Sequence, residues 1–351
     1  MRRPVLDILR CPKCKGSSFF LEGETEGRLE IESGVVICKD CGLSYTIKDG
    51  ILDILTNPSL AVIQEREAMD DEEYIKDEAG NGYKVTDETI ERFKDKFLSL
   101  PEGDGSYFFK KGGSFQTIKD ASSRFYSTFD ALNLTGKEKV LEIGSCFSWA
   151  SYKFAERGCK VTAIDISNYL KAARVYLEKA YFDRMFADMH DLPFADNTFD
   201  LVFSSAALHH TKNLKAVFSE IHRVLKKGGR IVLINESGRG IFEKVHPGFK
   251  ELEKRGFGDT SYSISQWRKG ARSAGFKDIK IDFLSIVDDY ITRHENRVSG
   301  ATVKLRLAYF IRRHRILESF LLFLLVMPRI FFRPKSWRMI CTRHKECVQD
   351  G

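Results

Sequence analysis

The sequence predicts an α/β protein, in which a largely parallel β-sheet carries helices on both faces and a small metal-stabilised domain precedes it. Two observations support this fold class. From Lys139 onward, short apolar runs alternate with amphipathic segments of helical period, as in parallel strands joined by helices. Before that region stand two Cys-x-x-Cys pairs separated by 23 residues, a pattern typical of a zinc site in a small domain.

Length and composition fit a folded chain of more than one domain. With 351 residues, the chain can form two domains with additions. A content of 43% hydrophobic and 30% charged residues is globular and excludes a disordered chain. The expected parts are a zinc domain at 1–57, a helical linker or cap at 58–135, the α/β domain at 136–287, a basic and apolar helical insertion at 288–335, and a last strand with its tail at 336–351.

The beginning of the chain, MRRPVLDILRCP, has no long apolar core of the signal-peptide kind. A cytoplasmic location is therefore the default expectation. The eight cysteines are then expected to be metal ligands or free thiols, since disulfides are rare in that compartment. No apolar run reaches the roughly 18 to 20 residues that span a bilayer. The closest approach, Ile316–Met327, contains Glu318.

The first chemical signal is the spacing of four cysteines. Each Cys-x-x-Cys pair can present two thiolates on one tight turn, and two pairs complete a tetrahedral shell of four sulfurs, which suits Zn²⁺. The stretch between the pairs has β-rich runs broken by Gly and Glu, which indicates a hairpin. A redox role for one pair would leave the other unexplained, and four unrelated thiols are the remaining alternative. The expected zinc ligands are Cys11, Cys14, Cys38 and Cys41.

This N-terminal region resembles the Trm112-like zinc-ribbon family. The resemblance rests on LDILRCPKC (Leu6–Cys14) and CKDCGLSYTIKDGILDIL (Cys38–Leu55), and it covers about residues 1–57. Thr46 and Leu52 stand where the family usually has prolines, which affects its turns and not its metal site. Members are small partners of methyltransferases or are fused to them. We expect this ribbon to pack in cis on the α/β domain and to cover the edge left by its short third strand, because open edges invite pairing.

Residues 58–135 begin with an acidic helical segment and end with an amphipathic one. The second segment places Phe115, Ile118, Phe125, Phe129 and Leu132 at three- to four-residue steps, as on one helix face. A linker with a packing helix is the favoured interpretation. The alternative is a cap over the active site, whose residues near the cofactor would be Tyr107, Phe108, Lys110 and Lys111.

The α/β pattern predicts strands and helices in alternation. The expected strands are 139–143, 159–165, 185–188, 199–205 and 230–236, and the expected helices are 148–157, 167–180 and 214–229, the last ended by its glycines. A helix at 263–276 then leads into a sixth strand at 277–287. The best candidate for a seventh strand, antiparallel beside the sixth, is Ser336–Arg343.

Chemically useful residues follow the predicted strands. Gly144 ends the first strand, Asp165 ends the second 21 residues later, and Asp188 ends the third. Ligands bind at the carboxyl ends of strands in such sheets, beside the point where the strand order reverses. A carboxylate at the distance of Asp165 can accept hydrogen bonds from the two hydroxyls of a ribose. Singly these residues are weak signals, but together they predict a nucleoside-binding edge.

The α/β region resembles the class I S-adenosylmethionine-dependent methyltransferases, in the branch close to small-molecule and quinone methyltransferases. The resemblance rests on VLEIGS, VTAIDIS, ADMHDLPFADNTFDLVFSSAALHH and EIHRVLKKGGRIVLI, within about residues 137–236. It implies a Rossmann-like sheet, with Glu142 and Gly144 at the methionine end of the cofactor. Asp165 would bind the ribose, and Asp188 with the backbone of Met189 would bind the adenine. Ser204 and Ser205, at the end of the fourth strand, would lie near the sulfonium. The implied cofactor-binding set is Glu142, Gly144, Ser145, Cys146, Asp165, Ile166, Asp188, Met189 and Ser204.

Cys146 and Ser148 stand where the family has glycines. S-adenosylmethionine carries no pyrophosphate, so the loop does not need bare backbone against phosphate oxygens. Ser148 can also cap the helix that begins at Trp149. We therefore interpret the loop as a working site, with a drifted, inactive site as the alternative.

The chemistry requires mainly that a nucleophile be placed in line with the sulfonium methyl group and that water be removed. If the acceptor is a hydroxyl, a base assists. His209 and His210 follow the fourth strand, where the acceptor would approach; the alternative is that they are packing residues of the loop. We expect transfer to a small-molecule, quinone or lipid-linked acceptor, most simply at a hydroxyl. The alternatives are an RNA methyltransferase, which the sequence SSAAL disfavours, and a non-catalytic scaffold on the same fold.

The basic charge of the chain is concentrated near its C-terminus. Residues 291–345 hold 13 Lys and Arg against 2 Asp and Glu, although the whole chain carries a net charge of only +7. Basic groups beside Leu and Phe suit a segment in the headgroup region of an anionic membrane, which would make the protein peripheral at the inner membrane face. A buried helix at Phe320–Val326 with a solvated basic rim, or an RNA-binding surface, are the alternatives. The sequence leaves the oligomeric state open.

Overall fold

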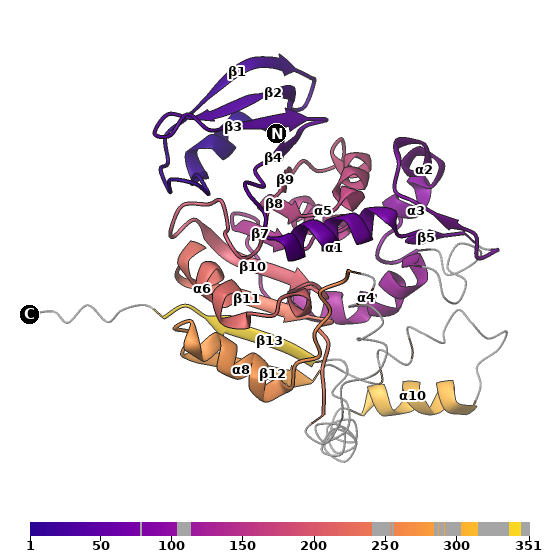
Figure 1. Ribbon diagram of the computed structural model, residues 1–351. Helices are drawn as coiled ribbons and strands as arrows, with labels where there is room; N and C mark the ends of the chain where they lie inside the picture. Colours follow the sequence, from indigo (N-terminus) through magenta and orange to yellow (C-terminus); the bar gives the residue numbers. More distant parts are fainter. Residues whose placement is uncertain are drawn as a thin grey trace, which may run out of the picture.

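The computed structural model describes residues 1–77, 79–103, 114–240, 254, 256–283, 287, 291, 303–314 and 337–344. Its main feature is one 11-stranded sheet with the order β1-β2-β3-β4-β9-β8-β7-β10-β11-β13-β12. Figure 1 shows the N-terminal strands at the top and the C-terminal strands at the bottom of this continuous sheet. The ribbon and the α/β domain therefore share a single sheet.

The ribbon supplies the first four strands. They are β1 (Phe19–Glu26), β2 (Ile31–Cys38), β3 (Ser44–Lys48) and β4 (Ile51–Asp53), preceded by the 3-10 helix η1 (Arg3–Ile8). Neighbouring strands in this group pair antiparallel, so the hairpin expected between the cysteine pairs is present as β1 and β2.

The α/β domain supplies the other seven strands of the sheet. Five run parallel in the spatial order β9-β8-β7-β10-β11. Their bounds are β7 (Lys139–Ile143), β8 (Lys160–Asp165), β9 (Asp183–Phe186), β10 (Phe199–Ser205) and β11 (Leu225–Ile234). The chain order reverses between β7 and β10, which fixes where a ligand is expected. The class of fold predicted from the sequence is thus confirmed.

The last strand was correctly located from sequence. β13 (Trp337–Thr342) lies antiparallel between β11 and β12 (Asp278–Phe283). Its side chains alternate between buried and half-buried, as expected of a strand with one face in the core.

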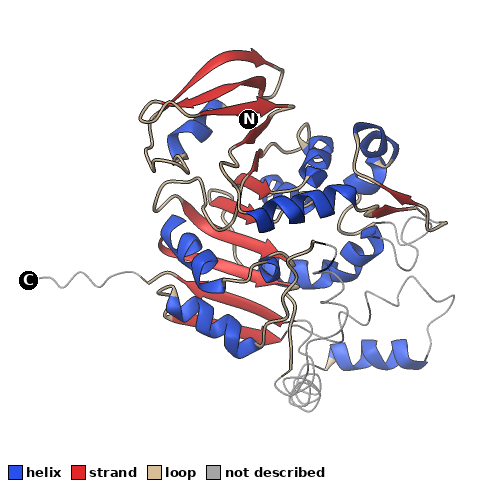
Figure 2. Ribbon diagram, in the orientation of Figure 1, coloured by secondary structure: helices blue, strands red, loops and turns tan. Residues whose placement is uncertain are grey.

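The 3-10 and α-helices of this domain are α5 (Trp149–Glu156), η2 (Asn168–Tyr176), η3 (Leu208–His210), α6 (Leu214–Val224) and α8 (Ile264–Ser273), and Figure 2 shows them beside the strands.

Two predicted helices differ in the structure. The segment expected as a helix over 167–180 winds as the 3-10 helix η2 and ends at Tyr176. The helix expected to run to the glycines at 228 and 229 stops at Val224, because Leu225 turns to extended backbone and pairs with Phe199. The run LKKGG therefore opens β11 and does not close α6.

The linker folds over the sheet as short elements. They are α1 (Leu60–Asp71), β5 (Ile75–Lys76), β6 (Gly82–Tyr83), α2 (Asp87–Arg92), α3 (Lys94–Leu98) and α4 (Ser114–Ala131). The end of α1 is fixed to η2: Asn168 donates from its backbone N–H and its Nδ2 to Asp70 at 2.8 and 2.7 Å, and the Tyr169 hydroxyl donates to Met69 O at 2.6 Å. Phe125 and Phe129 of α4 are buried, as the helical period predicts.

The ribbon packs in cis on the α/β domain by extending its sheet. β4 pairs parallel with β9, with Ile51, Leu52 and Asp53 opposite Arg184, Met185 and Phe186. This is the edge of the short third strand, so the expectation that the ribbon covers this edge is confirmed. The pairing removes a row of unpaired backbone groups that would otherwise invite association.

Among the ion pairs that join the ribbon to the α/β domain, two differ sharply in burial. Arg184 of β9 is 1% exposed; its Nη2 contacts Glu30 closely and donates to Asp49 O at 3.1 Å. Arg28 also pairs across the interface, with Glu178, but both side chains of that pair are 73% exposed.

α10 (Val303–Arg313) belongs to the basic insertion. Leu305 and Ala308 are buried, while Val303, Leu307 and Phe310 are 83%, 55% and 53% exposed. The apolar run at 320–326, central to the membrane hypothesis, lies outside the described residues. Within the part of the chain that the structure describes, no helix has both the length and the apolarity needed to cross a bilayer.

We predict that Arg184→Ala lowers the free energy of unfolding by about 3 to 5 kcal/mol, because it removes one partner of a buried ion pair and leaves Glu30 with only the Met1 ammonium and the Tyr181 hydroxyl. The matched change Arg28→Ala should cost at most about 1 kcal/mol, since exposed ion pairs are screened by solvent. Chemical denaturation followed by circular dichroism measures both. Equal losses for the two variants would contradict the role of the buried pair.

Candidate functional site

A cavity of about 560 Å³ lies at the carboxyl ends of β7, β8, β9 and β10. This is the position beside the reversal of strand order where α/β sheets bind ligands. Of the residues that the family resemblance assigns to the cofactor, those that border the cavity are Glu142, Gly144, Ser145, Cys146, Asp165, Ile166, Asp188 and Met189. The structure therefore brings together residues that are up to 47 positions apart in the sequence.

Ser204 is the exception and is a correction. Its side chain is fully buried, and its Oγ donates to Ile143 O of the neighbouring strand at 3.0 Å. Because successive residues of a strand point to opposite faces, it is Ser205 that borders the cavity.

Gly144 is required at the turn out of β7 by two constraints. Its φ is +68°, and a Cβ at this position would lie 2.2 Å from the Cβ of Ala207. A side chain here would therefore be strained and would also collide with the loop after β10. This close approach holds the loops after β7 and β10 together at the floor of the cavity.

The two positions that lack the family's glycines keep a glycine-like backbone. Cys146 has φ of +49° and Ser148 has φ of +59°, so both occupy the left-handed region. A residue with a Cβ in this conformation costs roughly 1 to 2 kcal/mol. Hydrogen bonds offset part of that cost: the Cys146 N–H donates to Asp165 Oδ2 at 2.7 Å, and the Ser148 N–H donates to Ser145 O at 2.6 Å.

The expectation that Ser148 caps α5 is wrong. Its left-handed backbone directs the side chain away from the free N–H groups of the helix, and no cap hydrogen bond forms. The Ser148 Oγ instead donates to the Oγ of Ser145 at 3.1 Å. Ser148 thus stabilises the loop and not the helix that follows it.

Asp165 is buried and held in one orientation by the chain. Oδ1 accepts from the backbone N–H and the hydroxyl of Ser167, both at 2.8 Å, and Oδ2 accepts from Cys146. Burial raises the pKa of this carboxyl, although these hydrogen bonds oppose the shift. The geometry leaves acceptor capacity on a preorganised carboxylate that borders the cavity.

Glu142 and Asp188 are oriented in the same way. The Ser151 hydroxyl donates to Glu142 Oε2, and burial, opposed by that hydrogen bond and reinforced by the charge of Asp165, raises the pKa of Glu142 to about 8. Asp188 Oδ1 accepts from the backbone of His190 at 2.8 Å and contacts its Nδ1 at 2.7 Å. This hydrogen bond raises the pKa of His190.

His209 has a carboxylate beside each of its ring nitrogens. Its Nδ1 lies 2.8 Å from Glu236 Oε2, and its Nε2 lies 3.4 Å from Asp259 Oδ1. Burial opposes the charged form, but these two carboxylates outweigh it and raise the pKa of His209 to about 9. His210 is the histidine of the pair that borders the cavity, and its Nδ1 lies 2.5 Å from Glu65 Oε1.

The linker also supplies cavity wall, so its interpretation as a linker with a packing helix is incomplete. Val62, Glu65 and Met69 of α1 border the cavity. The residues of α4 that border it are Thr117, Ile118, Ala121 and Arg124. The residues named for a cap, Tyr107, Phe108, Lys110 and Lys111, lie outside the described residues.

Sequence reasoning missed an aromatic wall and a polar chain in the cavity. Tyr74 stacks on Tyr169 with ring centroids 4.9 Å apart, and both border the cavity. On another side, Arg124 Nε donates to Asn235 Oδ1, and Asn235 Nδ2 donates to Ser205 Oγ at 2.9 Å. No local motif marks these residues, because they meet only when the linker folds over the sheet.

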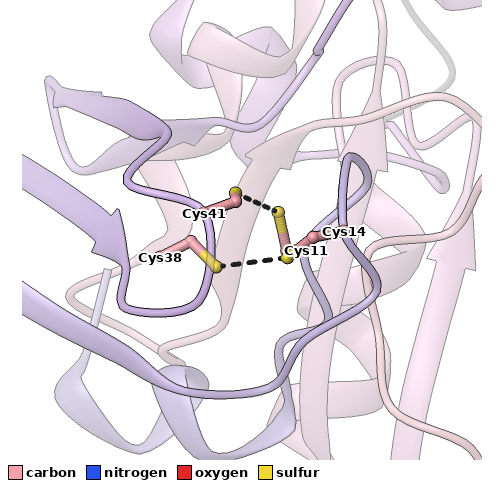
Figure 3. A group of neighbouring side chains, drawn as sticks. All are labelled: Cys11, Cys14, Cys38 and Cys41. Atoms are coloured by element: carbon pink, nitrogen blue, oxygen red, sulfur yellow. Dashed lines mark hydrogen bonds between the residues drawn. The ribbon is translucent and has the colours of Figure 1, made fainter.

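A separate cluster of four cysteines lies in the ribbon, and Figure 3 shows the side chains converging from two loops. The sulfurs of Cys11 and Cys41 are 3.7 Å apart, and those of Cys14 and Cys38 are 3.5 Å apart. All four lie within 4.8 Å of one another. Four sulfurs at the Zn–S distance of about 2.3 Å around a tetrahedral ion would be ~3.8 Å apart, so the donor set fits zinc. Tyr45 Oη contacts the Cys11 sulfur at 2.9 Å from outside the cluster.

Comparison with known proteins supports both parts of the chain. Residues 141–233 match the family model described as a methyltransferase domain, and residues 2–50 match the model described as Trm112p-like protein. The chain is 34% identical over 105 residues to malonyl-[acyl-carrier protein] O-methyltransferase of Buchnera aphidicola subsp. Baizongia pistaciae, which covers 30% of this chain and 42% of that protein. It is 27% identical over 193 residues to sterol 24-C-methyltransferase ERG6 of Saccharomyces cerevisiae, covering 52% and 50%.

A solved structure supports the fold. The Haemonchus contortus phosphoethanolamine N-methyltransferase 2 in complex with S-adenosyl-L-methionine aligns with a TM-score of 0.50 at 19% identity, covering 86% of this chain and 64% of that one. The chain spans half or less of the length of the two curated relatives. Residues 2–50 and 141–233 thus match models of the two families that the sequence resembles, and both resemblances are confirmed.

Proposed function

We propose that this chain is an S-adenosylmethionine-dependent methyltransferase that binds its cofactor in the cavity at the carboxyl ends of the parallel strands. The observation that carries the proposal is the arrangement of Gly144, Asp165 and Asp188 around one cavity of about 560 Å³, within a domain that matches a methyltransferase family model. The preorganised Asp165 carboxylate would accept from the ribose hydroxyls. Asp188, with the backbone of Met189, would hold the adenine.

Glu142 would supply charge at the methionine end of the cavity once a cationic cofactor is bound. Its carboxyl and that of Asp165 are both buried beside the cavity, where a cationic ligand strengthens the ionised form. S-adenosylmethionine brings a sulfonium and an ammonium group. The aromatic rings of Tyr74 and Tyr169 border the same cavity and would help to exclude water from the sulfonium methyl group.

The acceptor would enter from the side where α1 faces residues 257–259. Glu65, His210, Phe257 and Asp259 border the cavity there. The protein needs mainly to hold the acceptor in line with the methyl group, since the sulfonium is already electrophilic. We favour a small or lipid-like acceptor with a reacting hydroxyl; the two curated relatives are named for a malonyl-acyl-carrier-protein and a sterol substrate.

The competing proposal is a scaffold that retains the fold without cofactor. We predict that the wild-type chain binds S-adenosylmethionine and that Asp165→Ala weakens this binding about tenfold to a hundredfold, because it removes a charged acceptor worth roughly 1.5 to 3 kcal/mol. Calorimetry measures the affinity. Asp191→Ala is the control, since Asp191 pairs with Lys15 on the surface. No binding to the wild type would favour the scaffold, and unchanged affinity in Asp165→Ala would refute the role of this residue.

We further propose that the four ribbon cysteines hold one zinc ion, which stabilises the ribbon and takes no part in the chemistry. The support is the sulfur spacing and the match of residues 2–50 to the Trm112p-like model.

We predict that Cys38→Ser releases the zinc and melts the ribbon, because the binding free energy of a structural zinc site is part of its folding free energy. Elemental analysis and near-ultraviolet circular dichroism follow the two effects. The control is Cys159→Ser, which alters a buried cysteine outside the cluster. Less than half an equivalent of zinc in freshly purified wild-type protein would contradict the proposal.

A second surface suits an anionic membrane. Val303, Leu307 and Phe310 lie on one side of α10 and are more than half exposed. The cationic residues of the same helix are Lys304, Arg306, Arg312 and Arg313, and its sequence contains no acidic residue. We propose that this helix lies in the headgroup region, where apolar burial and attraction to anionic lipids act together.

Sedimentation with liposomes tests this surface. We predict binding to anionic vesicles and little binding to neutral ones, with at least a tenfold loss in the triple variant Val303→Ser, Leu307→Ser, Phe310→Ser, because each buried apolar side chain contributes roughly 1.5 to 3 kcal/mol. The matched control replaces Leu60 and Ile63, exposed apolar residues of α1, by serine. If the intact chain does not sediment with anionic vesicles, the membrane proposal is wrong.

A further inference from the structure

A second group of metal-ligating side chains lies beside the cavity, far from the ribbon cysteines. His209, His210 and Asp259 each offer a ligand atom, and these atoms lie within 4.8 Å of one another. Glu65 of α1 lies beside the group, in contact with His210. The histidines come from η3 and Asp259 from the segment before α8, so three separate parts of the chain converge here.

The distance between His209 Nε2 and Asp259 Oδ1 is long for an ion pair that shares a proton. It is 3.4 Å, whereas a charge-assisted N–H···O bond is typically about 2.7 to 2.9 Å. Two ligands of a tetrahedral ion at about 2.1 Å each would be ~3.4 Å apart. The separation therefore suits two atoms that share a metal better than two that share a hydrogen.

Glu65 and His210 supply an independent observation. Glu65 is 7% exposed, and its Oε1 lies 2.5 Å from His210 Nδ1. The angles do not make a hydrogen bond, so both atoms are buried polar atoms without a hydrogen-bond partner. Such atoms are costly unless something pairs with them. A cation bound beside this pair would offset that cost.

The histidine that contributes Nε2 is held as metal-binding histidines usually are. Its Nδ1 lies 2.8 Å from Glu236 Oε2, which leaves Nε2 directed at the cluster. Glu236 is itself fixed, because it accepts from the backbone N–H groups of Ala207, Leu208 and His209 at 3.1, 3.0 and 3.1 Å. A carboxylate behind the imidazole orients the ring and raises its basicity toward a metal.

The segment that carries Asp259 is tightly seated. A Cβ on Gly258 would lie 2.5 Å from His210 O and 3.1 Å from Glu65 Oε2, so only glycine allows this approach. On the other side of Asp259, the Thr260 N–H donates to His209 O at 2.8 Å. The carboxylate is thus positioned by backbone contacts to both histidines and does not depend on a free loop.

We propose that His209, His210 and Asp259 form a binding site for one divalent transition-metal ion, with Glu236 and Glu65 as supporting carboxylates beside the histidines. Two imidazoles and one carboxylate suit Zn²⁺, Mn²⁺ or Fe²⁺, whereas Mg²⁺ and Ca²⁺ prefer oxygen ligands alone. Glu65, His210 and Asp259 also border the cavity, so an ion here would face the acceptor side. The position of the ion on the acceptor side rests on the proposed function, whereas the ion site itself does not.

The test is a titration of the purified full-length chain, with its ribbon metal retained, with Mn²⁺, which does not compete well for thiolates. Loss of the free Mn²⁺ signal in electron paramagnetic resonance reports binding, without added S-adenosylmethionine. We predict one saturable Mn²⁺ site per wild-type chain, weakened at least tenfold in Asp259→Asn and His210→Gln. Glu236→Gln should weaken it about tenfold to a hundredfold, as supporting carboxylates do. Saturating Mn²⁺ should also raise the thermal midpoint of the wild type and not that of Asp259→Asn.

Glu72→Gln is the matched control, because Glu72 borders the same cavity outside the cluster and its change should leave Mn²⁺ affinity unaltered. A second zinc equivalent in purified wild-type protein that is lost in His210→Gln would support the same site. If the wild type has no saturable Mn²⁺ site and only one zinc, the cluster is an ion-pair network. Equal affinity in the wild type and Asp259→Asn would also overturn the proposal. Calorimetry with S-adenosylmethionine on the same preparation keeps the two questions separate.

Discussion

The pairing of β4 with β9 is the constraint on which the rest of the structure depends. It places the ribbon in the same sheet as the cofactor cavity, at the edge beside β8. The chain then passes from β4 into α1 within a few residues, and α1 borders the cavity through Val62, Glu65 and Met69. The position of the cavity wall is thus set by the strand that precedes it. Arg184 reinforces the junction from within, because its charge is neutralised by Glu30 of the ribbon.

Much of the fold was predictable because its signals are local. The parallel strands are predicted by their apolar runs, and the two cysteine pairs mark the ends of the hairpin between them. The position of β13 followed from a short β-rich run after a long insertion. Local signals failed where tertiary contacts decided the outcome. Leu225 leaves α6 because it pairs with Phe199, a residue of another strand.

The candidate site was predictable only on its sheet side. Gly144, Asp165 and Asp188 follow strands, so their meeting at one edge could be inferred from the pattern. The opposite wall is built from residues of the linker and from Asp259, whose positions no periodicity specifies. The sequence also does not show which of Ser204 and Ser205 borders the cavity. Neighbouring residues of a strand point to opposite faces, so one of them is buried and the other faces the cavity. For His209, the sequence could show neither Glu236 nor Asp259 at its two nitrogens.

The short connection from β4 to α1 has a consequence for how the ribbon and the methyltransferase domain meet. When a ribbon is a separate protein, the fraction of enzyme that carries it depends on the concentration of both chains. Here the encounter is intramolecular, and a short tether gives an effective concentration on the order of millimolar. The stoichiometry is fixed at one to one and is insensitive to dilution. The supply of a separate partner chain therefore cannot limit how much of this protein carries the ribbon.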